Sequence, residues 1–223
     1  MFKNRLQAGE LLVPRLKQYK DNPNVVVIGL PRGGVVTAFA VAQGLRVPLD
    51  VMCLRKIGAP FNSELAIGAV NETGKGYFNE ELIAQLGITQ RYVDEIVNRE
   101  KRLAQHRLNL YKNSRPALSL EDKTVILVDD GLATGATMRA AIISTKASCA
   151  ARVILAVPVG PPDTIAELSQ EVDEVICLET PFYFSAVGQF YRDFAQTEDQ
   201  EVIELLNKCR NIELHEKKDS IQT

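Results

Sequence analysis

Two adjacent carboxylates, Asp129 and Asp130, stand between an apolar run and a loop of small residues. The run from Val125 to Val128 has three β-branched residues, which predicts a buried strand. The loop extends to Thr137, and the segment from Met138 to Lys146 has the periodicity of a helix. A strand that leads through a glycine-containing loop into a helix predicts an anion site, because the first helical N–H groups have no partner within the helix.

The loop after the acids contains the residue types that a phosphate group requires. Gly131 and Gly135 allow the backbone to approach an oxygen, and Thr134 and Thr137 supply hydroxyl donors. Two neighbouring carboxylates would repel a phosphate that bound alone. The combination therefore indicates a ligand with a phosphate at one end and hydroxyl groups or a metal ion nearby, such as a ribose 5-phosphate. An ordinary strand-to-helix turn with surface acids is the alternative.

A second strand–loop–helix unit lies near the start of the chain. The apolar residues 25–30 predict a strand buried on both faces, and residues 35–43 predict a helix. The loop between them contains Arg32, which offers a fork of donors, and Gly33 and Gly34, whose amides an anion can approach. Taken alone, this pattern fits a glycine turn with a solvated arginine equally well.

The remaining segments predict the fold class. They add apolar strands and periodic helices, namely strands at 48–54, 65–70, 152–158 and 172–178, and helices at 5–18, 79–86, 90–112, 161–169 and 198–208. Mostly apolar strands that alternate with helices predict an α/β protein, in which a parallel sheet is flanked by helices. Ligands of such sheets bind at the C-terminal ends of the strands. Arg32 and the two acids both follow predicted strands at that end.

The composition narrows the possible functions. The chain has 223 residues, a formal net charge of −2 and only two histidines. These values give no reason to expect binding to nucleic acid or a membrane, and they exclude a histidine-rich metal centre. No segment reaches the roughly 20 apolar residues of a membrane span, and the charged N-terminus differs from a signal peptide. A cytoplasmic protein with reduced cysteines is therefore expected.

The stretch from Val125 to Thr137 resembles the signature of the type I phosphoribosyltransferases, which combines an apolar run, two acids, a small-residue loop and Thr-Gly followed by Thr. The resemblance implies that Asp129 and Asp130 hold the ribose hydroxyls of phosphoribosyl pyrophosphate (PRPP). It implies that the 5-phosphate is held by the small-residue loop, at Ala133, Thr134, Gly135, Ala136 and Thr137. Neither the Walker pattern nor the dinucleotide pattern fits this stretch.

The resemblance also assigns the first loop. In this family that loop binds the pyrophosphate of PRPP, which implies that Arg32, Gly33 and Gly34 contact it, and a non-proline cis peptide bond is expected near Arg32. The basic segment 55–60 corresponds by position to a mobile loop that closes over PRPP. Lys56 would then act with Arg32 to stabilise the leaving group. A basic loop without substrate contact is the alternative.

An aromatic-rich tail lies where family members carry a hood over the acceptor base. Six aromatic residues fall within 182–194, and Tyr183 and Phe184 are the expected residues for stacking on a flat heterocycle. Asp193 is expected to join the two acids around Mg²⁺, held directly or through ribose and water. Aromatic rings that only fill the space beneath an irregular hood are the alternative.

The resemblance predicts Mg²⁺-dependent transfer of the phosphoribosyl group from PRPP to a nitrogen acceptor, with release of pyrophosphate. The chain is similar to a bacterial group of phosphoribosyltransferases whose acceptor is unassigned, and we expect a small heterocycle, with a slight preference for a purine. Ala133 stands where some oxopurine-type members carry a third acid. The family implies a homodimer. The alternatives are a non-catalytic protein that senses PRPP or nucleotides, and hydrolysis of PRPP.

We expect one phosphoribosyltransferase-like domain over 1–223, with a core at about 24–160, a helical insertion at about 79–115 and a hood at about 179–197. The insertion departs from the small family members. Its long helix is basic on its outer faces, which predicts either a solvated surface or an arm that brings cations to a neighbouring phosphate site.

Overall fold

The computed structural model describes residues 1–112 and 118–219. Its central sheet has five strands in the order β2-β1-β6-β7-β8, and every neighbouring pair is parallel. The strands are β1 (Val25–Gly29), β2 (Leu49–Val51), β6 (Thr124–Val128), β7 (Arg152–Val159) and β8 (Glu174–Glu179). The predicted α/β fold, with a parallel sheet between helices, is confirmed.

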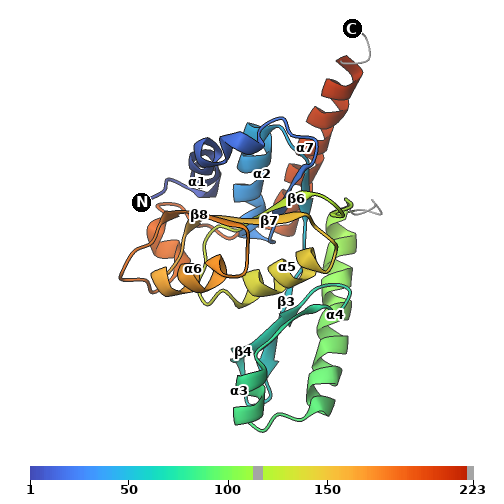
Figure 1. The fold of residues 1–223 in the computed structure, drawn as a ribbon, viewed down its shortest axis with the longest axis vertical. Helices are drawn as coiled ribbons and strands as arrows, with labels where there is room; N and C mark the ends of the chain where they lie inside the picture. The colour runs from blue at the N-terminus through green and yellow to red at the C-terminus, as the bar shows by residue number, and fades with distance from the viewer. Residues whose placement is uncertain (113–117, 220–223) are drawn as a thin grey trace.

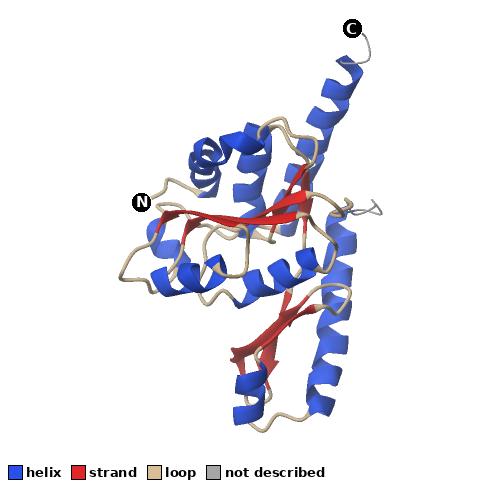
Figure 2. Ribbon diagram, in the orientation of Figure 1, coloured by secondary structure: helices blue, strands red, loops and turns tan. Residues whose placement is uncertain are grey.

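Helices cover both faces of this sheet (Figure 2). One face carries α1 (Arg5–Leu12), the 3-10 helix η1 (Val13–Tyr19), α2 (Gly33–Leu45) and α7 (Asp199–Asp219), and the other carries α5 (Ala136–Lys146) and α6 (Pro162–Ser169). The helix predicted at 5–18 is divided into α1 and η1, and Pro14 lies in the first turn of η1. Among the described residues, no helix combines the length and apolar character needed to cross a membrane.

The strands supply two separate cores because their side chains alternate between the faces of the sheet. In β1, Val25 and Val27 pack in the core beneath α1, α2 and α7. Val26 and Ile28 pack in the core beneath α5 and α6. All four side chains are at most 3% exposed. This double burial explains why the strands are continuous apolar runs rather than alternating ones.

The pairing of β1 with β6 aligns the two loops that the sequence singled out. Val25 lies opposite Thr124, and Gly29 lies opposite Val128, without any shift in register. Both strands therefore end at the same level, and their following loops leave the sheet side by side. Neighbouring strands are about 4.8 Å apart, so both loops can contact one small ligand.

A second, antiparallel sheet projects from the core (Figure 1). We call residues 55–112 the arm; it comprises β3 (Arg55–Ala59), β4 (Asn62–Val70), β5 (Gly76–Phe78), α3 (Glu80–Gln85) and α4 (Gln90–Lys112). The arm has a small core of its own, in which Ile57, Ile67 and Ile96 are buried. The prediction of a mobile loop at 55–60 is wrong for 55–59, because these residues pair with β4.

The arm rejoins the sheet at a buried ion pair. Lys112 Nζ lies 2.7 Å from Asp50 Oδ2 on β2, and the two side chains are 9% and 12% exposed. Asp50 also accepts hydrogen bonds from the backbone N–H groups of Val51 and Leu118. One carboxylate thus fixes the end of α4 and the start of the following described segment against the edge strand β2.

We expect Lys112→Ala to lower the free energy of unfolding by about 3 kcal/mol, because it leaves Asp50 as a buried charge without its partner. Urea denaturation monitored by circular dichroism measures this loss. Arg91→Ala is the control, since Arg91 pairs with Glu95 on the exposed face of the same helix. Such surface pairs contribute about 0–1 kcal/mol. Equal losses for both variants would contradict the structural role of the Lys112–Asp50 pair.

Candidate active site

The loops after β1 and β6 touch at the C-terminal edge of the sheet. A Cβ atom at Gly33 would lie 2.1 Å from Asp130 Oδ2, and one at Gly34 would lie 2.5 Å from Asp129 Oδ1. Only residues without a side chain allow this approach, so the two glycines place the first loop directly against the acids. The peptide bond between Pro31 and Arg32 is cis, which confirms the expectation for this loop.

Asp130 is held by an arginine from the N-terminal helix. Arg5 Nε donates to Asp130 Oδ2 over 2.6 Å, and the two side chains are only 12% and 15% exposed. The same guanidinium donates from Nη1 to the carbonyl oxygen of Ala195 over 2.6 Å and lies 3.8 Å above the Phe194 ring. Arg5 therefore connects the second acid with the segment that follows the aromatic tail.

A tyrosine from that tail also reaches the acid loop. The Tyr191 hydroxyl donates to the backbone carbonyl oxygen of Asp130 over 2.5 Å, and the Tyr191 side chain is buried. Sequence reasoning missed both Arg5 and Tyr191 as neighbours of Asp130. The only signal was electrostatic: a partly buried pair of acids needs a nearby cation, but the sequence does not say which of its cations comes close.

Burial and mutual repulsion distinguish the two acids. Burial first, and then the negative charge of Asp130, raise the pKa of Asp129 well above its ordinary value. Burial also raises the pKa of Asp130, but the hydrogen bond and positive charge of Arg5 oppose that rise. Asp129 Oδ1 meanwhile accepts a hydrogen bond from the backbone N–H of Asp130 over 2.8 Å. Of the two carboxylates, Asp130 is the one whose charge the protein balances with a direct ion pair.

The raised pKa of Asp129 makes the stability of the free protein depend on pH. An acid whose pKa is higher in the folded state keeps its proton there while the unfolded chain loses it, so stability falls as the pH rises between the two values. We expect Asp129→Asn to melt at a higher temperature than wild type at pH 8. The difference should shrink towards pH 4, near the ordinary pKa of aspartic acid, about 3.9.

Thermal unfolding by calorimetry across this pH range measures the effect. Asp94→Asn is the control, because Asp94 is exposed on α4. A difference between Asp129→Asn and wild type that stayed constant from pH 4 to pH 8 would rule out titration of Asp129 as its cause.

The small-residue loop ends at an open helix N-terminus. Gly135 occupies the N-cap position of α5 with φ 73°, a left-handed conformation that glycine adopts without strain, and its cap carries no side-chain hydrogen bond. Ala133, Thr134 and Thr137 are exposed around it. The first N–H groups of α5 therefore remain available to an anion, and the helix dipole favours negative charge there.

The two predicted cationic residues, Arg32 and Lys56, lie on different parts of the molecule. Arg32 is the N-cap residue of α2, and its Nη1 atom lies 3.4 Å from Oε2 of Glu198, a side chain that is 69% exposed. Such a weak, solvated pair can be exchanged for a bound anion. Lys56 lies within β3, opposite Ala69, with an exposed side chain. The structure thus places Arg32 beside the glycines of the first loop and Lys56 on the arm.

The aromatic tail is largely packed against itself. Phe184 is half-buried and stacks on Phe190 with ring centroids 5.2 Å apart. Tyr183 is 85% exposed and, with Phe182, forms an edge-to-face pair at the surface. Of the two residues expected to stack on an acceptor, Tyr183 is largely exposed to solvent, whereas Phe184 is half-buried against Phe190.

The acids suit a magnesium ion that is shared with a substrate. Mg²⁺ prefers oxygen ligands and often binds through one or two carboxylates together with substrate phosphates. Asp129 and Asp130 supply such carboxylates beside the open N-terminus of α5. Across residues 1–112 and 118–219, no group of three or more acids, histidines or cysteines is arranged to hold a metal by itself. Asp193 is therefore not gathered with the two acids into one protein-only metal site.

The amino-acid sequence of this chain is similar to those of known proteins. Residues 3–194 match the family model described as the phosphoribosyl transferase domain. The chain is 42% identical over 209 residues to curated proteins from the CDC 1551 and H37Rv strains of Mycobacterium tuberculosis, which are provisionally named phosphoribosyl transferases. These matches cover 94% of this chain and 47% of the relatives. The chain thus spans about half the length of the curated relatives it matches.

A solved structure shares the fold as well. The protein TT1426 from Thermus thermophilus superposes with a TM-score of 0.80 at 38% sequence identity, and the match covers 92% of this chain and 97% of that one. The family model and this solved structure each match most of the chain. The protein belongs to the phosphoribosyl transferase domain family.

Proposed function

We propose that this protein transfers the phosphoribosyl group of PRPP to a nitrogen acceptor and releases pyrophosphate. One observation carries the proposal: two glycines of the first loop lie against a partly buried pair of acids, beside the open N-terminus of α5. PRPP has three parts that match these three features. Its 5-phosphate suits the helix terminus, its ribose hydroxyls suit the acids, and its pyrophosphate suits the loop that contains Arg32.

The residues have complementary roles in this proposal. As the bond from C1 of the ribose to pyrophosphate breaks, positive charge develops on the ring and negative charge on the leaving group. Asp129 and Asp130 orient the ribose through its hydroxyls and stabilise the positive charge. Arg32 and the amides of Gly33 and Gly34 stabilise the leaving group. Charge placed in advance in this way lowers the barrier without reorganisation during the reaction.

Magnesium completes the proposed site. Asp129 and Asp130 would hold the ion directly or through ribose hydroxyls and water, while pyrophosphate oxygens supply its other ligands. When bound, Mg²⁺ neutralises negative charge on the leaving group. Lys56 lies within β3, which pairs with β4, and it would add a further positive charge if the arm moved towards bound PRPP.

The acceptor in this proposal is a small heterocycle. The support is the exposed aromatic pair at the surface of the tail, where Tyr183 is 85% exposed and Phe182 is 86% exposed. Aromatic faces of this kind stack on flat rings.

We further propose that residues 1–223 act as one domain with a hood at about 179–197. We also propose that the protein works in the cytoplasm as a homodimer. Analytical sedimentation would test the dimer.

We expect Asp130→Asn to lower kcat/KM for PRPP by tenfold or more. Its carboxylate would make charge-assisted hydrogen bonds to ribose, which are worth about 1.5–3 kcal/mol each, and tenfold corresponds to about 1.4 kcal/mol. Asp163→Asn is the control, because Asp163 is an exposed acid on α6. An Asp130→Asn protein with a normal fold and unchanged kinetics would refute the role of this acid.

Release of pyrophosphate from PRPP tests the reaction itself. The assay includes a panel of nucleobases, a tube without base, and a tube with a chelator, in which we expect release to stop. Release that depends on one base identifies the acceptor. Equal release in every tube would replace transfer with hydrolysis. If PRPP raises the melting temperature but no pyrophosphate appears, the protein senses PRPP and the catalytic proposal fails.

A further inference from the structure

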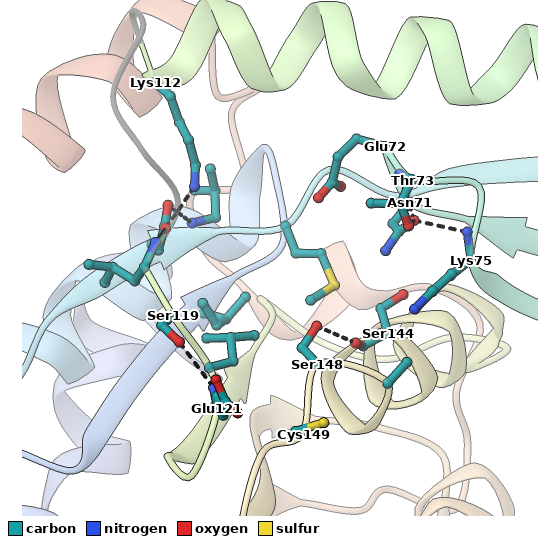
Figure 3. Close-up of a pocket in the computed structure, with 17 residues that line it drawn as sticks. Asn71, Glu72, Thr73, Lys75, Lys112, Ser119, Glu121, Ser144, Ser148 and Cys149 are labelled. Atoms are coloured by element: carbon teal, nitrogen blue, oxygen red, sulfur yellow. Dashed lines mark hydrogen bonds and ion pairs between the residues drawn. The ribbon is translucent and has the colours of Figure 1, made fainter.

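A cavity of about 460 Å³ lies between the arm and the parallel sheet. Its walls come from β2, from the turn at 71–75 between β4 and β5, from residues 118–121, and from the C-terminal end of α5 (Figure 3). No residue proposed to bind PRPP lines it. The loop proposed for the 5-phosphate lies at the opposite end of α5. Sites for small ligands commonly have volumes of about 300–1,000 Å³.

Two oxygen atoms in the wall of this cavity lack hydrogen-bond partners. Glu72 Oε2 and Ser144 Oγ are both buried, and neither has a partner among the described residues. The whole Ser144 residue is only 2% exposed. Its neighbour Ser148 donates to the Ser144 backbone carbonyl over 2.9 Å and not to the Ser144 hydroxyl. A buried polar group without a partner costs about 1–3 kcal/mol, so such groups in native proteins call for an explanation.

The chemistry of these two oxygen atoms determines which ligand groups could form hydrogen bonds with them. An ionised carboxylate oxygen only accepts hydrogen bonds, whereas a hydroxyl group both donates and accepts. A ligand that satisfies both must therefore present an N–H or O–H donor to Glu72 and a second polar atom to Ser144. Figure 3 shows Glu72 and the turn on one side of the cavity, with Ser144 and Ser148 across from them on α5.

The rest of the wall mixes apolar and polar residues and contains two cations, Lys75 and Lys112. Ile28, Met52 and Leu120 line the cavity from the sheet side, and they belong to or pack against the core beneath α5 and α6. Lys75 lines it from the exposed turn. Apolar side chains suit the face of a flat ring, while the polar atoms suit its edge. Ligand sites commonly combine apolar contacts with polar groups that orient the ligand, and here the polar share is large.

We propose that this cavity is a second binding site, for a small heterocycle whose edge carries N–H donors, as in a nucleobase or nucleoside. The N–H edge faces Glu72 and Ser144, and the ring lies against Ile28 and Met52. The inference goes beyond the proposed PRPP chemistry and does not depend on it, because none of the residues that carry it takes part in that reaction.

The position of the cavity gives its occupant a regulatory role. α5 begins at the small-residue loop proposed for the 5-phosphate and reaches the cavity at its other end. The arm packs on the same helix, where the Arg139 guanidinium lies 5.7 Å from the ring centroid of Tyr77 on β5. A ligand between the turn at 71–75 and α5 therefore fixes the arm relative to the helix that leads from the phosphate loop.

Calorimetric titration tests the site with adenine, guanine, hypoxanthine and their nucleosides, without PRPP or Mg²⁺. We expect at least one of them to bind, and Glu72→Gln and Ser144→Ala to weaken that binding by tenfold and severalfold, respectively. Two variants outside the cavity, Glu95→Gln on the exposed face of α4 and Tyr183→Ala in the aromatic tail, are expected to bind normally. Melting curves verify that every variant folds.

Cysteine labelling locates the bound molecule independently. Cys149 lines the cavity and is exposed, whereas Cys53 and Cys209 are buried. Burial raises the pKa of Cys53 to about 12 and that of Cys177 to about 11, which suppresses their reactivity. We expect a saturating base to slow modification of Cys149 by a maleimide. The proposal is overturned if no base or nucleoside binds, or if binding persists in Glu72→Gln, is lost in Tyr183→Ala and leaves Cys149 unprotected.

Discussion

A pair of adjacent, partly buried carboxylates requires positive charge close by, and Arg5 supplies it here from the first helix. Its contact with Asp130 connects three regions that are distant in sequence, because the same guanidinium bonds to Ala195 and covers the ring of Phe194. Gly33 leaves room for this contact, since a side chain at that position would meet both Arg5 and Asp130. A single ion pair thus holds together four segments, namely the N-terminal helix, the acid loop, the first glycine loop and the tail.

The same electrostatic arrangement explains why the site is ready for a polar ligand. Asp130 has a direct cationic partner, whereas Asp129 depends on a backbone N–H and has the more strongly raised pKa. A ligand that brings hydroxyl donors or a cation stabilises the charged form of Asp129, which the free protein disfavours. Such a ligand would therefore favour ionisation of Asp129.

The local sequence pattern was enough to predict much of the fold and part of the candidate site. The apolar runs at β1 and β6 and the helix from Gln90 to Lys112 appear as predicted, because burial on both strand faces and a capped periodic helix leave clear patterns. The strand β3 was missed, since Arg55, Lys56 and Gly58 disguise its alternation and its partner β4 supplies the stabilising bonds. Arg5 and Tyr191 were missed as partners of Asp130, because contacts across 125 and 61 residues leave no local signal.

The far end of the arm offers a place to modify the molecule. Gly87, between α3 and α4, has φ 61° and no atom within 4 Å of the position that a Cβ would occupy, and α3 has no buried residue. From there α4 runs 23 residues, about 35 Å at 1.5 Å per residue, before it reaches β2. Added residues or a fluorescent dye at this tip would leave the register of the five-stranded sheet unchanged. A dye at this tip would therefore label the arm without altering the sheet that carries the candidate site.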